Sequence, residues 1–275
     1  MLCAICCLLL ALIGPQWGFH WEPVRRRGVD LMVAIDVSNS MLAEDITPNR
    51  LSRAKWAVQE LLPLLRGDRL GLVAFAGSSF VQCPLTNDYG AVALTLEDLS
   101  TGTIPKGGTA LASAIRASVK AFDAGTEESR ALIIITDGED HEGDALAAAN
   151  DAANTGVKIF CIGMGTPEGE LIPAGPAQPG AGFMKDREGR TVKSRLNEEL
   201  LQRVALATGG SYVRATPTAF GLDVIYRERI ANMKTHEVEG ARQKQYEPRF
   251  QWPLALAWLL LIMEALIADR RRGRA

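Results

Sequence analysis

The sequence lacks a large excess of charge of either sign, and it is poor in cysteine. Its 275 residues contain 30 Lys and Arg against 32 Asp and Glu, a net charge of -2. Because no bulk positive charge is present to hold a polyanion, we do not expect nucleic acid as a partner. Five cysteines are too few for a disulfide scaffold. A chain with 47% hydrophobic residues must therefore fold around its own core.

Three familiar enzyme motifs are also missing. The sequence has no G-x-G-x-x-G after its first strand, no G-x-x-x-x-G-K-S/T and no G-x-S-x-G, which argues against a dinucleotide enzyme, a P-loop ATPase and an α/β-hydrolase. One enzyme hypothesis stays open, a magnesium-dependent phosphotransferase with Asp36 as its nucleophile. Such sites need another carboxylate close to the nucleophile, and serines follow Asp36 instead. We therefore expect no enzyme and no catalytic residue.

The long hydrophobic runs lie at the two ends of the chain. Residues 1–14 are apolar but short, and we interpret them as a membrane segment that is incomplete at its start. Residues 252–268 contain one ionisable group, Glu264, and they predict a transmembrane helix, with a buried terminal helix as the alternative. The basic tail 269–275 favours the cytoplasm and so places the rest of the chain outside it. Arginines at 25–27 argue for the opposite orientation.

Between these ends the sequence alternates between strand and helix patterns. Short, nearly continuous apolar runs predict buried parallel strands at 29–36, 70–76, 131–137 and 157–163, with a further strand near 211–214. Helical patterns separate them at 48–62, 89–99, 110–122, 144–154 and 197–207, with another helix after Pro217. This alternation predicts a doubly wound α/β domain over 29–230, whose mostly parallel sheet gains one short antiparallel edge strand at 80–84.

Two further stretches depart from the alternation. Residues 167–194 form a long insertion rich in proline, with a hairpin turn expected at 186–189, and loops of this length are usually functional or mobile. Residues 231–251 are polar and lack periodicity, so we expect a stalk there.

Oxygen-bearing side chains follow several of the predicted strands. Asp36, Ser38 and Ser40 alternate after the first strand, Asp137 follows the strand at 131–137, and Thr109 follows a pair of glycines. The carboxyl ends of parallel strands share one edge, so these groups can meet there, and five oxygens without nitrogen or sulfur select a hard cation. Helix capping is the alternative role for the serines. We expect His141 and the acidic residues 139, 140, 142 and 144 to be solvated.

This D-x-S-x-S arrangement with a distant Thr and a distant Asp resembles the metal-ion-dependent adhesion site of von Willebrand factor A (VWA) domains. Further motifs resemble the BatA and BatB group of bacterial membrane proteins. They are Pro15-Gln16-Trp17, Met41-Leu42-Ala43-Glu44-Asp45, Pro48-Asn49-Arg50, Val81-Gln82-Cys83-Pro84-Leu85-Thr86 and Thr136-Asp137-Gly138-Glu139-Asp140-His141.

The resemblance implies a VWA fold and a metal site formed by Asp36, Ser38, Ser40, Thr109 and Asp137, some of them acting through water. The expected ion is Mg²⁺, with Mn²⁺ or Ca²⁺ as alternatives, and a partner protein supplies an Asp or Glu to it. The group further implies an inner-membrane protein in an envelope complex with the domain outside the cytoplasm. Its partners would be other VWA membrane proteins and a MoxR-type AAA+ ATPase. A purely structural scaffold role is the alternative.

Overall fold

The structure is a computed structural model, and it describes residues 2–13, 16–23, 28–65, 67–122, 129–140, 144–174, 182–216, 220–233, 242–249 and 251–272. The chain divides into two compact units. One contains residues 26–237, and the other combines the two ends of the chain, 1–25 and 238–275.

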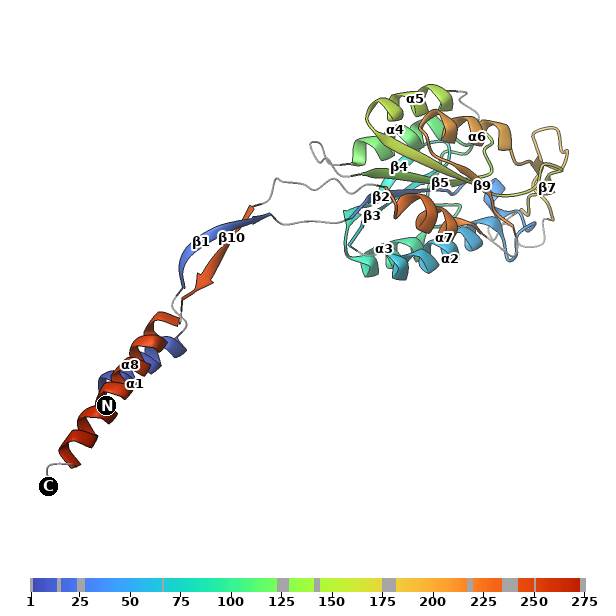
Figure 1. Cartoon of the computed structure of the whole chain (residues 1–275). Coiled ribbons are helices and arrows are strands. Elements are labelled where there is room, and N and C mark those ends of the chain that lie inside the picture. Colours follow the sequence, from blue (N-terminus) through green and yellow to red (C-terminus); the bar gives the residue numbers. More distant parts are fainter. Residues whose placement is uncertain are drawn as a thin grey trace. The chain divides into compact units, whose positions relative to one another are not determined.

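The unit 26–237 is built on a six-stranded sheet (Figure 1). The strands follow the order β4 (Ser79–Thr86), β3 (Arg69–Phe75), β2 (Asp30–Asp36), β5 (Arg130–Thr136), β6 (Val157–Gly163) and β9 (Tyr212–Arg214). Neighbouring strands are parallel except for β4, which runs antiparallel to β3 at the edge. The predicted fold class, with one antiparallel edge strand, is therefore confirmed.

Helices cover both faces of this sheet. In Figure 1, α2 (Arg50–Leu61), α3 (Tyr89–Asp98) and α7 (Leu222–Ile225) lie on one face, and α7 continues into the π-helical turn η3 (Tyr226–Ile230). The other face carries α4 (Leu111–Ala121), α5 (Ala145–Asn154) and α6 (Glu198–Ala207).

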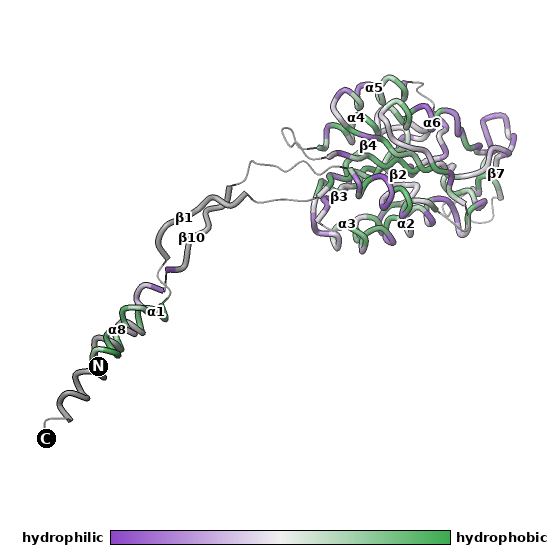
Figure 2. The backbone as a smooth tube through the Cα atoms, in the orientation of Figure 1, coloured by the Kyte–Doolittle hydropathy of each residue, from purple (hydrophilic) through white to green (hydrophobic). Residues whose placement is uncertain are grey.

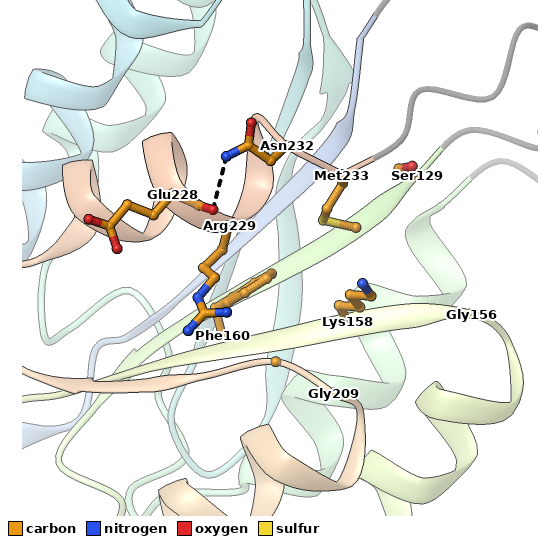
Figure 3. Close-up of a pocket in the computed structure, with 10 residues that line it drawn as sticks. Ser129, Gly156, Lys158, Phe160, Gly209, Glu228, Arg229, Asn232 and Met233 are labelled. Atoms are coloured by element: carbon orange, nitrogen blue, oxygen red, sulfur yellow. Dashed lines mark hydrogen bonds between the residues drawn. The ribbon is translucent and has the colours of Figure 1, made fainter.

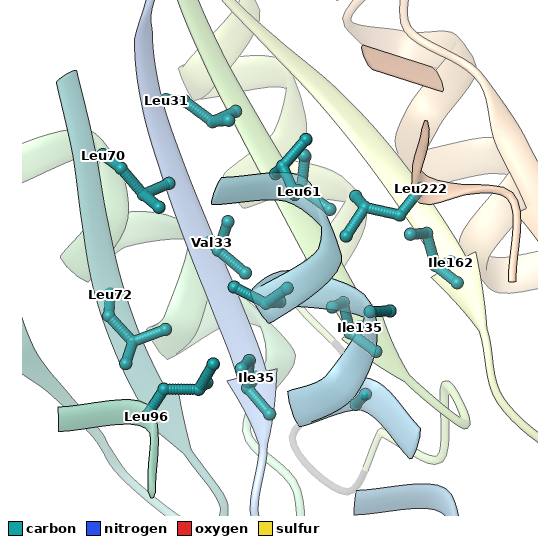
Figure 4. Packing of buried hydrophobic residues seen from close by; sticks show 14 of the residues in the cluster. Leu31, Val33, Ile35, Leu61, Leu70, Leu72, Leu96, Ile135, Ile162 and Leu222 are labelled. Carbon is teal, nitrogen blue, oxygen red and sulfur yellow. The ribbon is translucent and has the colours of Figure 1, made fainter. Parts of the chain in front are cut away.

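The central strand β2 shows why the sheet needs both helical layers. All seven of its residues are buried, and successive side chains alternate between two hydrophobic clusters. Leu31, Val33 and Ile35 pack with residues of α2 and α3 (Figure 4), whereas Met32 and Ala34 face α4. Figure 2 shows hydrophobic residues concentrated along these strands. A strand that is apolar on both faces is stable only when both are covered.

The order of the strands sets the position of the site. From β2 the chain moves to β3 and β4 on one side, and it then returns to β5 on the other side of β2. The winding therefore reverses between β2 and β5, where doubly wound sheets bind their ligands. Ile35 pairs with Ile135, so Asp36 and Thr136 end neighbouring strands at the same edge.

Helix α2 begins later than the sequence pattern indicated. We expected a helix from residue 48, but Asn49 is the cap, and its side-chain oxygen accepts a hydrogen bond of 2.8 Å from the Ser52 amide. Because Asn is a strong N-cap residue, the helix starts at Arg50. This start brings Arg50 into the protein interior, where it becomes part of the site described below.

The second unit is formed by segments from both ends of the chain. Helices α1 (Leu2–Leu12) and α8 (Gln251–Arg272) lie side by side, and strand β1 (Gln16–Pro23) pairs antiparallel with β10 (Arg242–Pro248). Within the segment 231–251, which we expected to be a stalk, residues 242–248 pair their backbone with a strand from the other end of the chain. Within the described part of the chain, none of the helices combines the length and apolar character needed to cross a membrane. The prediction of a membrane span at 252–268 is not supported by that finding.

Candidate metal centre

The segment after β2 folds its polar side chains around Asp36. Asp36 is fully buried, its Oδ1 accepts a hydrogen bond of 2.9 Å from the Ser38 amide, and its Oδ2 accepts one of 2.6 Å from the hydroxyl of Thr136 on β5. The Oγ atoms of Ser38 and Ser40 lie 2.9 Å apart. The 3-10 turn η1 (Asn39–Leu42) bends the chain at this point, so the three motif side chains gather in one buried place.

Asp137, the residue after β5, is fully buried beside this segment. Its Oδ1 accepts a hydrogen bond of 3.1 Å from the Glu139 amide. Its Oδ2 accepts a bond of 2.8 Å from the Ser194 hydroxyl. The charge of Asp137 contributes to raising the pKa of Asp36, as expected for two carboxylates that follow neighbouring strands. The structure therefore brings together Asp36 and Asp137 as their shared sheet edge requires.

Thr109 is placed at the same edge by main-chain hydrogen bonds on both sides of it. The Gly77 amide donates to the Lys106 carbonyl over 3.0 Å, and the Ala110 amide donates to the Ala76 carbonyl over 2.7 Å. These bonds fix the Thr109 loop to the end of β3, the neighbour of β2. Thr109 is itself buried. All five residues of the predicted set thus lie at the carboxyl end of the sheet.

The loop after β5 closes the other side of the Thr109 segment. Asp140 accepts a hydrogen bond of 3.4 Å from the Leu111 amide at the start of α4. Glu139 accepts one of 2.7 Å from the Arg195 amide. The expectation that these two acidic residues are simply solvated is therefore wrong, because they connect loops around the site. His141 and Glu142 lie outside the described residues.

The electrostatics of the site favour a cation from outside the chain. Burial, followed by the charge of Asp137, raises the pKa of Asp36 from 3.8 to about 7, although hydrogen bonds from Ser38 and Thr136 partly oppose this rise. Within the described residues, no Lys or Arg pairs with Asp36. Two adjacent buried carboxylates are unfavourable unless a positive charge compensates them.

The available donors fit a hard divalent cation. They are two carboxylates and three hydroxyls, all oxygen, which is the chemistry that Mg²⁺ and Ca²⁺ prefer. In the part of the chain that the structure describes, no three or more His, Cys, Asp or Glu side chains gather to hold a metal. An ion at this edge therefore needs the hydroxyls of Ser38, Ser40 and Thr109, or water, to complete its coordination.

Arg50 is the residue of the site that sequence reasoning missed. It is fully buried and binds both carboxylate oxygens of Asp45, at 2.8 and 2.7 Å. Its Nη1 also donates to Ser194 Oγ at 2.6 Å, to Asp137 Oδ2 at 3.3 Å and to the Ser40 carbonyl at 3.4 Å. One guanidinium therefore joins three separate segments around the candidate centre. Its position in a Pro-Asn-Arg motif was the available signal, but that motif does not reveal burial.

Gly165 makes room for this arginine. Its φ of +114° is unfavourable for residues with a side chain, and a Cβ at this position would lie 2.5 Å from Arg50 Nη2. The loop after β6 can therefore pass over the guanidinium only as glycine.

Two cavities distinguish the two ends of the sheet. One of about 450 Å³ adjoins the candidate centre and is lined by Glu139, Asp140, Pro167, Arg195, Leu196 and Asn197. Another of about 480 Å³ lies at the opposite end, around the beginnings of β5 and β6, and includes Lys158, Phe160 and Arg229 (Figure 3). Of these two cavities, the first borders the loop that follows Asp137.

Comparison with known proteins identifies the family. The profile of the von Willebrand factor type A domain matches residues 31–139. A UPF0353 protein of Mycobacterium ulcerans is 30% identical over 271 residues, which cover 94% of this chain and 73% of the relative. The crystal structure of BatB from Bacteroides thetaiotaomicron is 40% identical, with a TM-score of 0.69, and the match covers 73% of this chain and 97% of that one.

A second solved structure extends the likeness. An aerotolerance-related membrane protein from Bacteroides fragilis is 38% identical, with a TM-score of 0.71, and the match covers 75% of this chain and 100% of that one. These relatives match the unit that holds the candidate centre along most of its length. The chain therefore belongs to the von Willebrand factor type A family and, within it, to the group of BatB-like, aerotolerance-related proteins.

Proposed function

We propose that this protein is a metal-dependent protein-interaction module. Asp36, Ser38, Ser40, Thr109 and Asp137 hold a divalent ion, and an Asp or Glu of a partner protein completes the coordination. The observation that carries the proposal is the pair of buried carboxylates at the switch point between β2 and β5. Within the described residues, no Lys or Arg forms an ion pair with Asp36. VWA domains commonly mediate metal-dependent protein interactions, which agrees with this reading.

Charge arithmetic favours an open coordination position. Two carboxylates balance the formal charge of a divalent ion. However, Arg50 also attracts the negative charge of Asp137 Oδ2, so Asp137 neutralises the ion less completely. The ion thereby keeps an attraction for a further carboxylate, and when bound it supplies a bridge of positive charge between two acidic groups. We propose Mg²⁺ as the physiological ion, with Mn²⁺ and Ca²⁺ as alternatives.

The environment of Asp36 supports binding rather than catalysis. A nucleophilic carboxylate must reach its substrate, but Asp36 is fully buried. We therefore propose that the protein is not an enzyme, and that no bond is broken at this site.

The relatives suggest where the module works. One structural neighbour is described as a membrane protein, and this supports membrane association of the present chain. We propose that the domain lies outside the cytoplasm at a bacterial inner membrane, within an envelope complex. We also propose, from the resemblance alone, that its partners are another VWA membrane protein and a MoxR-type AAA+ ATPase.

Capture of partners by the full-length chain tests the proposal. Proteins bound in Mg²⁺ are compared with those bound in EDTA, using wild type, Asp36→Asn, Asp137→Asn and, as a matched control, the exposed Asp151→Asn. We expect a partner that is retained by wild type and Asp151→Asn in Mg²⁺ only. A partner held equally in EDTA and by Asp36→Asn would leave a structural scaffold role, and phosphate release from an acyl phosphate with Mg²⁺ would restore the phosphotransfer alternative.

A further inference from the structure

The insertion between β6 and α6 begins and ends at the candidate metal centre. At its base, the Leu196 amide donates to the Thr166 carbonyl over 3.1 Å, which closes the loop. The Asn197 amide then donates to the Asp137 carbonyl over 2.8 Å. The insertion therefore projects from the edge of the sheet that carries the metal-binding residues.

Its returning strand is fixed directly to a proposed metal ligand. Ser194, in the short strand β8 (Lys193–Ser194), is fully buried and donates its hydroxyl hydrogen to Asp137 Oδ2 over 2.8 Å. The same hydroxyl oxygen accepts a hydrogen bond of 2.6 Å from Arg50 Nη1. Since a buried residue with two such bonds cannot move independently, the neighbouring Lys193 stays close to the centre.

The second half of the insertion, 182–195, forms a hairpin arm. Strand β8 pairs with β7 (Glu170–Leu171), and further out the Val192 amide donates to the Met184 carbonyl over 2.9 Å. A turn reverses the chain at its tip, where the Asp186 amide donates to the Arg190 carbonyl over 2.8 Å. Arg190, at the end of this turn, precedes Ser194 by four residues, a reach of about 13 Å in extended backbone.

The arm is strongly basic although the whole chain is slightly acidic. It contains five basic residues and two acidic ones, a net charge of +3, whereas the full chain carries -2. Arg190 is occupied, because it pairs with Asp186 at 2.9 Å and also with Glu188. Four other cations are exposed and make no ion pair within the described residues; they are Lys185, Arg187, Lys193 and Arg195.

We propose that this basic arm is a second contact surface for the partner that binds the metal, and that the partner presents an acidic segment. The inference rests on the proposed function. One carboxylate of the segment reaches the ion, and further carboxylates, within about four extended residues of it, lie along the arm. The metal centre accepts a carboxylate, and the arm offers cations that make no ion pair within the described residues. Both therefore attract an acidic segment and raise the rate at which the partner associates.

Two labelled peptides test this inference on the full-length chain. One is octaglutamate and the other contains a single Glu among seven Ser, and binding is followed by fluorescence anisotropy in excess Mg²⁺. We expect wild type to bind octaglutamate about tenfold more tightly than the single-Glu peptide, a preference that declines at high salt. The variant Lys185→Glu, Arg187→Glu, Lys193→Glu should lose this preference while it still binds Mg²⁺.

A matched variant controls for total charge. Lys158→Glu, Arg203→Glu, Arg229→Glu also reverses three exposed cations, none of them on the arm, and it should keep the preference. Equal binding of the two peptides by wild type, or a preference that survives in the arm variant, would overturn the inference. If wild type binds the single-Glu peptide no better in Mg²⁺ than in EDTA, the metal-bridged contact itself fails, and the role of the arm fails with it.

Discussion

Strand β2 carries a buried aspartate at each end, and the two differ in the charge of their neighbours. Asp30 receives two hydrogen bonds, of 2.8 and 2.6 Å, from the guanidinium of Arg69. Asp36 accepts hydrogen bonds from Ser38 and Thr136 and faces a second carboxylate. The comparison separates a structural carboxylate, which the chain neutralises itself, from one whose compensating charge must come from elsewhere.

Arg50 connects these two kinds of carboxylate. It closes a bidentate pair with Asp45, as Arg69 does with Asp30, but it also reaches Asp137 at the candidate centre. Arg50 therefore stabilises the domain and positions a proposed ligand through the same guanidinium.

The largest expected effect comes from removing that guanidinium. Arg50→Met should lower the free energy of unfolding by about 3–5 kcal/mol, because Asp45 and Asp137 lose a buried cation. Urea denaturation of the metal-free protein measures this. Arg53→Met on the same helix is the control, since Arg53 pairs over 3.7 Å with an exposed Glu60, and a change within about 1 kcal/mol is expected. Equal effects of the two substitutions would contradict the central place given to Arg50.

The two ends of β2 should respond differently to the same substitution. Asp30→Asn should cost about 2–3 kcal/mol in the metal-free protein, because it removes the charge of the buried Asp30–Arg69 ion pair. Mg²⁺ at about 100 times its Kd should still stabilise this variant by about 2.7 kcal/mol. Asp36→Asn should leave the metal-free protein at pH 8 at least as stable as wild type and should abolish the effect of Mg²⁺. Unfolding curves with and without Mg²⁺ give both quantities. A large loss of metal-free stability in Asp36→Asn would assign it a structural role like that of Asp30.

A smaller effect is expected where the backbone passes over Arg50. Gly165→Ala should destabilise the protein by about 2 kcal/mol, because the positive φ is strained and the new methyl group meets the guanidinium. Gly102→Ala is the control, since the nearest atom to its added Cβ lies 4.0 Å away. Thermal unfolding compares the two. A Gly165→Ala protein as stable as Gly102→Ala would show that the arginine is less tightly packed than described.

The smallest effect is the change in the free energy of unfolding per pH unit, about 1.4 kcal/mol, that the titration of Asp36 produces. With a pKa of about 7 in the folded protein against 3.8 when unfolded, Asp36 holds more proton in the folded state between these values. The stability of the metal-free protein should therefore decrease as pH rises from about 4 to about 7. Mg²⁺ must displace that proton, so its affinity should fall about tenfold per pH unit below about 7. Urea unfolding of the metal-free protein and Mg²⁺ titration of wild type, each at several pH values, test this. If the stability of metal-free Asp36→Asn depends on pH as that of wild type does, the assignment to Asp36 is contradicted.

Most of the fold could be predicted because the buried strands have a simple signal. Strands such as 157–163 are apolar runs between turn residues, and the order of strands and helices then fixes which carboxylates share an edge. The pairing of Gln16–Pro23 with Arg242–Pro248 was missed because it depends on backbone contacts between distant, polar segments. Arg50 and Ser194 were missed for a related reason. A single Arg or Ser carries no mark of burial, and 144 residues separate the two that bond to one another.

Binding of Mg²⁺ to the metal-free, full-length protein at pH 8 tests the central claim most directly. Isothermal titration should show one ion per chain for wild type and for Asp30→Asn, and none for Asp36→Asn or Asp137→Asn. Binding that persists unchanged in both Asp36→Asn and Asp137→Asn would contradict the account, because the ion would then be held by other residues.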